Sequence, residues 1–493
     1  MAPLIILLFI PVFLLFLLRE TRTSKSVRLP PGPPGLPLIG NLHQFDISNT
    51  QRYFWQLSKQ YGPIILLRLG SASTLVISSA KLAKEALKTH DLQFCGRPFL
   101  LGQKMLSYNF SDVAFTPYNA YWREMRKICV VHLFNSIRVQ QFRPIREYEV
   151  SRMIEKISKS AAVSKPVNLS EMMLTLTSTI ICRLAFGKSY DDEGSERSRF
   201  HALLNETQAM LGSFFFSDYF PSLSWIDNLT GMKRRLEENF KECDQFYQEL
   251  IDEHLHPNRP KTEQEDIIDV LLHIRKDREV KADVTMDNIK AVLMNVFVGG
   301  TDAGAAAVVW AMTNLMKNPK AMKKAQEEVR NVIKDKGFVD EDDLQRLQYL
   351  KAVVKETLRM QPSAPLVPRA TTERCIVDGY EIPAKTIVFV NAWAVGRDPE
   401  AWDNPLEFYP DRFIGSSIDL QGQHFELIPF GSGRRICPGM FMAISTVELA
   451  LANLIYRFDW EMPHGMEREA LDFEVLPGIT MHKKNPLLLR AIN

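Results

Sequence analysis

The sequence predicts a mainly helical protein with a small β portion, preceded by an N-terminal membrane-anchor helix. Most of the chain has apolar residues at helical spacing, two short stretches alternate around turn residues, and residues 2–18 form an uncharged apolar run. The 493 residues, 46% of them hydrophobic, suffice for a large core. We therefore expect one body over residues 42–493, although the length alone would tolerate two domains.

The apolar run at residues 2–18 is the first predicted element. Its seventeen residues would span about 26 Å as a helix, slightly less than the roughly 30 Å hydrocarbon core of a membrane. A cleaved signal peptide is the alternative, but the run lacks a basic segment before it and a small-residue cleavage site. We assign residues 1–22 to an anchor with its basic flank. The basic residues that follow the run place the rest of the chain in the cytosol.

A proline-rich hinge and two hairpins are predicted next. Residues 23–41 contain several prolines, which remove backbone donors and stiffen the chain into an extended spacer. Residues 64–69 and 73–79 flank a short turn as a hairpin, and residues 375–391 repeat this pattern around Asp378-Gly379. These stretches make up the small β portion.

The longest predicted helix covers residues 285–317 and ends before Pro319. It would be about 50 Å long, and its middle is apolar on nearly every face, so it should cross the interior of the body. A polar stretch before it, residues 256–266, is predicted to be a surface loop. A further helix is predicted directly after Pro438, which suits a first helical turn.

Charge and cysteine content exclude several classes of function. Sixty basic and fifty-eight acidic residues give a net charge of +2, so no overall field attracts nucleic acid, and we expect no nucleic-acid partner. The six cysteines form no CxxC pair, which argues against a zinc site and against a disulfide framework. Binding of small apolar molecules remains open.

One of these cysteines lies in an unusual setting. Cys437 is surrounded by Gly431, Gly433 and Gly439, which allow a tight turn and close approach to a bulky group. A cysteine just ahead of a helix N-terminus is stabilised as a thiolate, which can bind a metal ion. Arg435 could pair with a carboxylate of the same ligand. For the cysteine alone, an inert buried thiol would be the commoner interpretation.

The surrounding residues resemble the haem-ligand signature FxxGxRxCxG of the cytochrome P450 monooxygenases. Three further motifs of that family follow its order, and the similarity spans essentially the whole chain, being greatest to plant microsomal members. The matching residues are Phe430, Gly433, Arg435, Cys437 and Gly439 in the signature, Trp122 and Arg126 in WxxxR, Glu356 and Arg359 in ExxR, and Arg412 in YPDRF, residues 409–413.

The resemblance implies a cytochrome P450 fold with haem b as cofactor over residues 42–493. Cys437 would be the axial ligand of the iron, and its thiolate would favour oxygen–oxygen bond cleavage. Phe430 and Gly439 would border the haem. The side chains expected at its propionates are Trp122, Arg126, Arg369 and Arg435. Three more residues, expected to form a buried structural clamp beneath it, are Glu356, Arg359 and Arg412.

The long helix departs from the family pattern. Family members typically have an acid followed by a threonine, which together steer protons to dioxygen. Here Asp302 is present, but Ala303 occupies the threonine position. Thr301 is no substitute, because two helical positions turn its side chain about 200° away from that of Ala303. Asp302 is the expected catalytic acid, with a purely structural acid as the alternative.

Substrate contacts are expected from several regions. Residues 99–115 and 210–220 carry apolar and aromatic side chains that suit a lipophilic or aromatic molecule, although some would be ordinary core residues. Residues 362–369 look one position shorter than the plant pattern, which weakens any inherited substrate assignment. The individual pocket residues expected are Val296, Gly300, Ala303, Leu366 and Val367.

The leading functional prediction is a monooxygenase that inserts one oxygen atom of dioxygen into a small plant specialised metabolite. Its electrons would come from NADPH through NADPH-cytochrome P450 reductase, at the endoplasmic reticulum membrane, in a single-pass protein facing the cytosol. Because Ala303 replaces the usual threonine, a haem-thiolate enzyme for rearrangement or dehydration, of the hydroperoxide or aldoxime type, is the alternative. A haem-binding sensor or carrier is the third interpretation.

Overall fold

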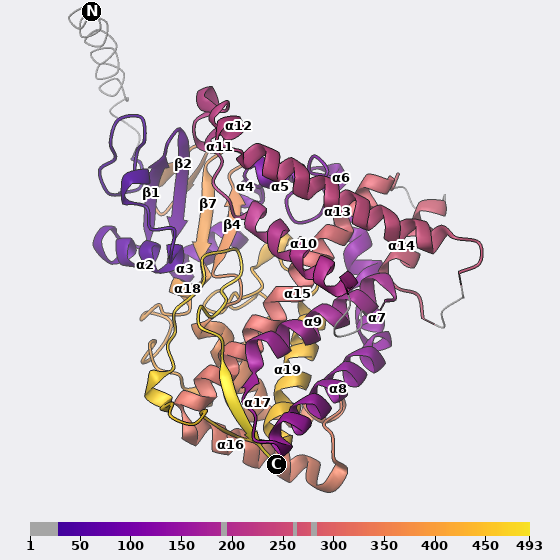
Figure 1. Ribbon diagram of the computed structural model, residues 1–493. Coiled ribbons are helices and arrows are strands. Elements are labelled where there is room, and N and C mark those ends of the chain that lie inside the picture. Colours follow the sequence, from indigo (N-terminus) through magenta and orange to yellow (C-terminus); the bar gives the residue numbers. More distant parts are fainter. Residues whose placement is uncertain (1–27, 189–194, 260–263, 278–282) are drawn as a thin grey trace, which may run out of the picture.

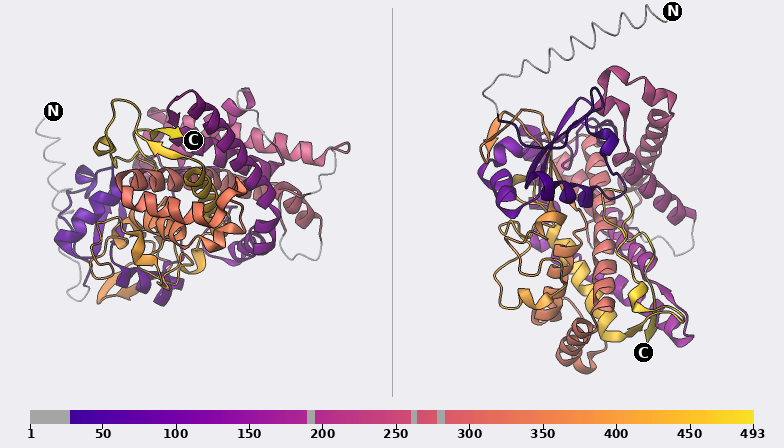
Figure 2. Two further views of the ribbon diagram at one scale, coloured as in Figure 1. Left: turned by 90° about the horizontal axis from the view of Figure 1, so that it is seen from below. Right: turned by 90° about the vertical axis from the view of Figure 1, so that its left-hand side faces the viewer.

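The computed structural model describes residues 28–188, 195–259, 264–277 and 283–493 (Figure 1). Helices make up most of this body, and a smaller β portion lies at one side of it, near the start of the described chain (Figures 1 and 2). The mainly helical prediction is therefore confirmed. The predicted anchor, residues 1–22, and residues 23–27 of the hinge lie outside the described residues.

The central helix is α15 (Met286–Lys317), which passes through the middle of the body (Figure 1). It begins with a capping box, in which the side chains of Thr285 and Asn288 accept each other's backbone N–H groups. It ends at Lys317, two residues before Pro319, the first residue of α16 (Pro319–Ile333). These bounds match the predicted helix within one residue. The apolar composition is explained by burial, since α15 packs on both α9 (Leu169–Phe186) and α19 (Met440–Arg457).

The remaining long helices pack around α15 and its neighbours (Figures 1 and 2). Their apolar faces merge into one large cluster of buried side chains that also includes much of α15. These helices are α8 (Arg143–Ala162), α10 (Ser195–Leu211), α13 (Met232–Leu255), α14 (Ile267–Lys276) and α17 (Gln348–Met360). The helix α2 (Thr50–Tyr61) instead packs its buried Phe54 and Leu57 against the main sheet, in a separate cluster.

The main sheet has four strands in the order β1-β2-β7-β4. The strands β1 (Ile64–Leu69) and β2 (Ala72–Ile77) form the first predicted hairpin. The strand β7 (Ile387–Asn391) runs parallel to β2 and antiparallel to β4 (Leu366–Ala370). Of the two neighbours of β7, β4 comes from the same half of the chain and β2 from the N-terminal region, so the sheet joins the N-terminal region to the C-terminal half.

The second predicted hairpin is shorter than expected. The strands β5 (Cys375–Val377) and β6 (Tyr380–Ile382) pair around Asp378 and Gly379, whose φ angles are 49° and 77°. The prediction that residues 375–391 form this hairpin as a whole was wrong, because β7 leaves it for the main sheet. In the main sheet β7 pairs with two strands, whereas in the hairpin it could pair with only one. A third sheet joins β3 (Val167–Asn168), β9 (Leu488–Ile492) and β8 (Asp459–Glu461).

The described part of the hinge lies against the body. Pro31 accepts a hydrogen bond from the backbone N–H of Leu66 at 2.9 Å, and Asn41 donates its own to the carbonyl of Arg68 at 2.6 Å. The prolines therefore run along β1. Of the predicted loop 256–266, residues 260–263 lie outside the described residues, and Asp266 is buried as the N-cap of α14.

Three of the described helices are long and apolar enough to cross a membrane, namely α9, α15 and α19. At least 61% of the most apolar stretch of each is buried inside the body. Their apolar composition is accounted for by this burial, as expected for core helices.

Candidate active site

Cys437 lies in a tight turn just before α19. Its backbone N–H donates to the carbonyl of Phe430 at 3.0 Å, which closes the turn. Gly433 has a φ of 69°, and a Cβ there would lie 2.5 Å from the carbonyl oxygen of Leu87, so only glycine fits. The helix begins at Met440 with Gly439 as its N-cap, so the prediction that Pro438 occupies the first helical turn was wrong.

The surroundings of Cys437 leave room for a ligand. It is partly exposed, whereas the other five cysteines are all buried. Burial of the sulfur raises the pKa of the Cys437 thiol, while the Gly439 amide and Arg126 act in the opposite direction. A Cβ on Gly439 would meet no protein atom within 4 Å. The space beside the turn is thus free of protein atoms, as a bulky group bound at the sulfur requires.

Four arginines gather around this turn. Arg435 donates to the carbonyl of Cys95 at 2.8 Å and to that of Thr116 at 2.7 Å, while its Nη1 is buried without a hydrogen-bond partner. The other three also donate to backbone carbonyls, Arg126 to Ile436, Arg369 to Ser432 and Arg97 to Ala114.

The charges of these arginines are left without counter-ions by the protein. Within the described part of the chain, no carboxylate forms an ion pair with Arg97, Arg126, Arg369 or Arg435. Burial and the neighbouring guanidinium groups lower the pKa of Arg97 to about 10 and that of Arg435 to about 9, and they hold the pKa of Arg369 well below its usual range. Uncompensated buried cations are costly. A dianionic ligand such as haem, with two propionates, would neutralise them, so the residues present fit the expected group.

The sequence reasoning missed Arg97 and misjudged the role of Trp122. The indole Nε1 of Trp122 donates to the carbonyl of Val113 at 2.9 Å and is therefore already engaged. The Trp122 ring instead stacks under Arg435, with the guanidinium carbon 4.2 Å from the ring centroid. Nothing in the sequence around Arg97 marks it, because folding alone brings it to the cluster.

The predicted clamp is assembled as expected. Arg359 donates two hydrogen bonds to the Glu356 carboxylate, at 2.7 and 2.8 Å, and both side chains are completely buried. Arg412 adds a third at 3.1 Å. Arg359 also donates to the carbonyls of Pro405 and Glu407. The clamp therefore attaches the irregular segment 405–412 to the helix α17.

Asp302 is buried in α15 and paired. Its Oδ2 lies 2.9 Å from Nε2 of His482, a residue near the C-terminus that the sequence reasoning did not single out. Thr301 donates its hydroxyl to the carbonyl of Phe297, so it is bound to its own helix. A serine hydroxyl lies near Ala303, the position where family members typically have threonine. Ser363 donates this hydroxyl to the carbonyl of Ala303 at 2.8 Å.

The expected pocket residues fall into two groups. Val296 and Val367 are buried in hydrophobic clusters, and Gly300 faces α9, since a Cβ there would lie 2.4 Å from Cδ1 of Ile181. Ala303 and Leu366 are partly exposed. Their contacts with a substrate stay a prediction.

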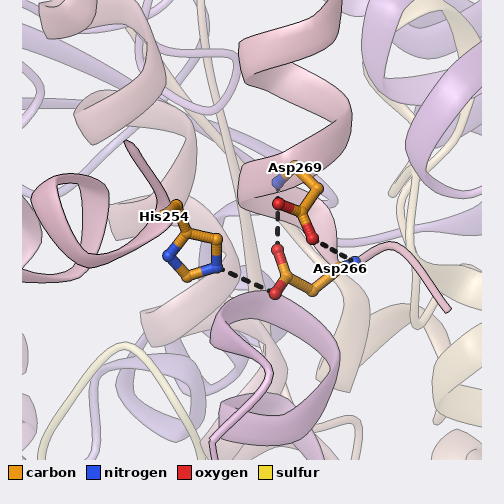
Figure 3. A group of neighbouring side chains, drawn as sticks. All are labelled: His254, Asp266 and Asp269. Carbon is orange, nitrogen blue, oxygen red and sulfur yellow. Dashed lines mark hydrogen bonds and ion pairs between the residues drawn. The ribbon is translucent and has the colours of Figure 1, made fainter. Parts of the chain in front are cut away.

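A second cluster of ionisable side chains lies away from this site. His254, Asp266 and Asp269 point toward one another at the start of α14, with His254 Nε2 2.9 Å from Asp266 Oδ2 (Figure 3). Arg259 forms ion pairs with both carboxylates. The guanidinium thus supplies the positive charge that a metal ion would bring, and Asp266 also caps the helix.

Comparison with known proteins identifies the family of the chain. A family model described as Cytochrome P450 matches residues 30–490. The chain is 52% identical to the 6,7,8-trihydroxycoumarin synthase of Pastinaca sativa over 488 residues, which are 97% of this chain and 95% of the relative. It is 47% identical to the strychnine-11-hydroxylase of Strychnos nux-vomica over 483 residues, 97% of this chain and 94% of the relative. A zebra fish cytochrome P450 solved with progesterone aligns with a TM-score of 0.76 at 24% identity, covering 90% of this chain and 99% of that one.

Proposed function

The chain belongs to the cytochrome P450 family of haem-containing monooxygenases, and from this premise we propose that it inserts one atom of dioxygen into a small lipophilic or aromatic plant metabolite. The observation that carries the proposal is the Cys437 turn, with four unneutralised arginines around the space beside it. Bound haem iron with a thiolate ligand supplies the activation of dioxygen. The residues of this chain bind the haem, orient the substrate and supply protons.

Each group of side chains has a proposed role. Cys437 would provide the sulfur ligand of the haem iron, and the Cys437 turn, from Phe430 to Gly439, would border the haem. Arg97, Arg126, Arg369 and Arg435 neutralise the propionates, with Trp122 stacked beneath Arg435. The clamp of Glu356, Arg359 and Arg412 holds the backbone that supports this region. Asp302 is the acid that supplies protons within the site.

The substrate class is proposed from the relatives and the sequence together. Two relatives are named 6,7,8-trihydroxycoumarin synthase and strychnine-11-hydroxylase, and both names refer to hydroxylated compounds. Residues 99–115 and 210–220 would contribute apolar and aromatic contacts, together with Val296, Gly300, Ala303, Leu366 and Val367. A planar, oxygen-bearing aromatic compound suits this description, and a spectral screen for ligand binding with such compounds is the direct test.

A rearrangement or dehydration of a hydroperoxide or an aldoxime is the second candidate. It is favoured by Ala303, since a methyl group can neither donate a hydrogen bond nor hold a water molecule. Turnover under nitrogen separates the two candidates. Oxygen insertion must stop without dioxygen or NADPH, whereas dehydration or isomerisation must continue. Product formed in their absence would overturn the oxygenase proposal.

We also propose the supply of electrons and the location. Residues 1–22 would anchor the protein in the endoplasmic reticulum membrane, residues 23–41 would link the anchor to the catalytic domain at 42–493, and NADPH-cytochrome P450 reductase would deliver electrons on the cytosolic side. The chain offers four glycosylation sequons, at 109–111, 168–170, 205–207 and 228–230. Asn109, Asn205 and Asn228 are exposed, so glycosylating enzymes would reach them if the catalytic domain faced the lumen instead of the cytosol. Glycans on protein from plant microsomes would contradict the cytosolic orientation, and their absence is expected.

A further inference from the structure

The buried carboxylate of Asp302 is held by a histidine from the other end of the chain. His482 Nε2 lies 2.9 Å from Asp302 Oδ2. Within the described residues, His482 is the only side chain that hydrogen-bonds to this carboxylate. The side chain of Asp302 is 6% exposed and that of His482 is 30% exposed. The pair therefore connects the interior of α15 to solvent.

The backbone next to His482 is held in place from two sides. Met481 donates its N–H to the carbonyl of Ser363 at 2.8 Å and accepts a hydrogen bond from Nε1 of Trp310, in α15, at 2.7 Å. The hydroxyl of Ser363 in turn donates to the carbonyl of Ala303. One serine thus links the His482 segment to the residue after Asp302, which fixes the imidazole against the carboxylate.

The two ring nitrogens of His482 have different surroundings. Nε2 faces Asp302, and within the described part of the chain Nδ1 has no hydrogen-bond partner. The other His–Asp pair of the structure differs, because His254 uses Nδ1 for the carbonyl of Leu250 at 2.6 Å as well as Nε2 for Asp266 (Figure 3). His254 is fixed at both nitrogens, whereas His482 keeps one nitrogen available for exchange with water.

We propose that His482 positions Asp302 and exchanges protons between solvent and its carboxylate. This inference rests on the proposed oxygen insertion, which consumes protons. In each transfer a hydronium ion gives a proton to Nδ1 and becomes water, the imidazolium so formed passes its Nε2 proton to Oδ2 of Asp302, and no electron moves. The ring then carries its proton on Nδ1, and rotation of the ring about the Cβ–Cγ bond returns an N–H to Asp302 and a free nitrogen to solvent.

The charges next to His482 do not compete for Asp302. Lys483 pairs with Asp472 at 2.9 Å, and Lys484 pairs with Glu474 at 2.9 Å. Both lysines are therefore engaged by carboxylates of their own segment, and the histidine remains the partner of the buried acid. Among the described residues, His482 is thus the side chain through which a proton can pass between this carboxylate and water.

Two variants separate positioning from proton exchange. His482→Gln keeps an N–H donor for Asp302 but cannot carry a proton, whereas His482→Leu removes both functions. His254→Gln is the matched control, since it alters the second His–Asp pair far from the proposed site. The measurements are product formed per NADPH consumed, hydrogen peroxide released and the solvent isotope effect, with the reduced carbon monoxide spectrum as a check on folding.

His482→Gln is expected to lower product per NADPH by at least about threefold, less than the ~10²-fold of a full general acid because water partly replaces the ring. Hydrogen peroxide should rise, and the solvent isotope effect should change. His254→Gln should match the wild type in all three measurements. If His482→Gln has the coupling and the isotope effect of the wild type, the proton-exchange role is overturned. Glutamine restores only the hydrogen bond to Asp302, so a purely structural role of His482 would then account for the data.

A readout that needs no turnover tests the pairing itself. In the reduced, carbon monoxide-bound holoenzyme labelled with ¹⁵N-histidine, the ring signals missing from His482→Gln belong to His482. These signals should shift in Asp302→Asn, and those of His254 should not. Unshifted signals would overturn the inference. If they shift but the wild type forms no product from NADPH and dioxygen, the proposed function and the proton-exchange role both fail, and only the pairing stands.

Discussion

Glu356 and Arg359 form a two-point ion pair in which both side chains are completely buried. The two residues are three apart in α17, so they share one helix face. Removing one partner would leave an uncompensated buried charge, which costs about 3–5 kcal/mol. We therefore expect Arg359→Leu to lower the free energy of unfolding by that amount, measured by urea denaturation of the full-length protein in detergent.

An exposed pair provides the control for the clamp. Arg234 and Glu238 lie 2.8 Å apart, and their side chains are 82% and 60% exposed. Glu238→Gln should cause no measurable loss, because exposed ion pairs are screened by water and salt. Similar stability changes in the two variants would contradict the structural role of the clamp.

The two adjacent arginines of the Cys437 turn should differ in their effect on haem retention. Arg435 is buried among cations, whereas Arg434 is partly exposed and pairs with Asp91 at 2.9 Å. Loss of a charge-assisted bond to a propionate costs about 1.5–3 kcal/mol, which corresponds to roughly 10- to 150-fold faster haem loss in Arg435→Gln. Arg434→Gln should retain haem like the wild type. Transfer of haem to apomyoglobin measures both rates, and equal rates would contradict the propionate assignment.

Neighbouring glycines in α15 should respond oppositely to the same substitution. A Cβ on Gly300 would lie 2.4 Å from Ile181, so Gly300→Ala should destabilise the protein by about 1–3 kcal/mol through overpacking against α9. A Cβ on Gly299 would meet nothing within 4 Å, so Gly299→Ala should stabilise it by about 0.5–1 kcal/mol through helix propensity. Thermal unfolding of both variants tests the packing. A stable Gly300→Ala protein would show that α9 and α15 are further apart.

The extent to which the sequence predicted these features depends on how local each one is. The extent of α15 followed from its helical pattern and from Pro319, and the β1–β2 hairpin followed from alternation around a turn. The destination of β7 could not be predicted, because one of its two partners is β2, a strand from the distant N-terminal region.

The same distinction holds within the site. Cys437, Glu356, Arg359 and Arg412 could be singled out from the sequence because they lie in motifs with fixed spacing. Arg97 and His482 were missed, because each acquires its meaning only from a residue far away in the sequence. Trp122 was found, but the bond from its indole to Val113 depends on the fold of an irregular loop.

Restoring the hydroxyl in α15 tests how protons reach the site. If oxygen insertion uses water near the Ala303 methyl, Ala303→Thr should raise product per NADPH, whereas it should lower it if substrate fills that space. Ala303→Val is the control for crowding, since valine has the same shape without the hydroxyl. Identical effects of Thr and Val, together with product formation that needs neither NADPH nor dioxygen, would favour the dehydration or rearrangement reaction.

The most direct test of the account is the spectrum of the reduced carbon monoxide complex. If Cys437 is the thiolate ligand, the wild type must show the strongly red-shifted Soret band that thiolate ligation produces, and Cys437→His must lose it while still binding haem. Cys375→Ser, which alters a buried cysteine on β5, should keep the band. An unchanged spectrum in Cys437→His would contradict the assignment of the axial ligand and with it the proposed active site.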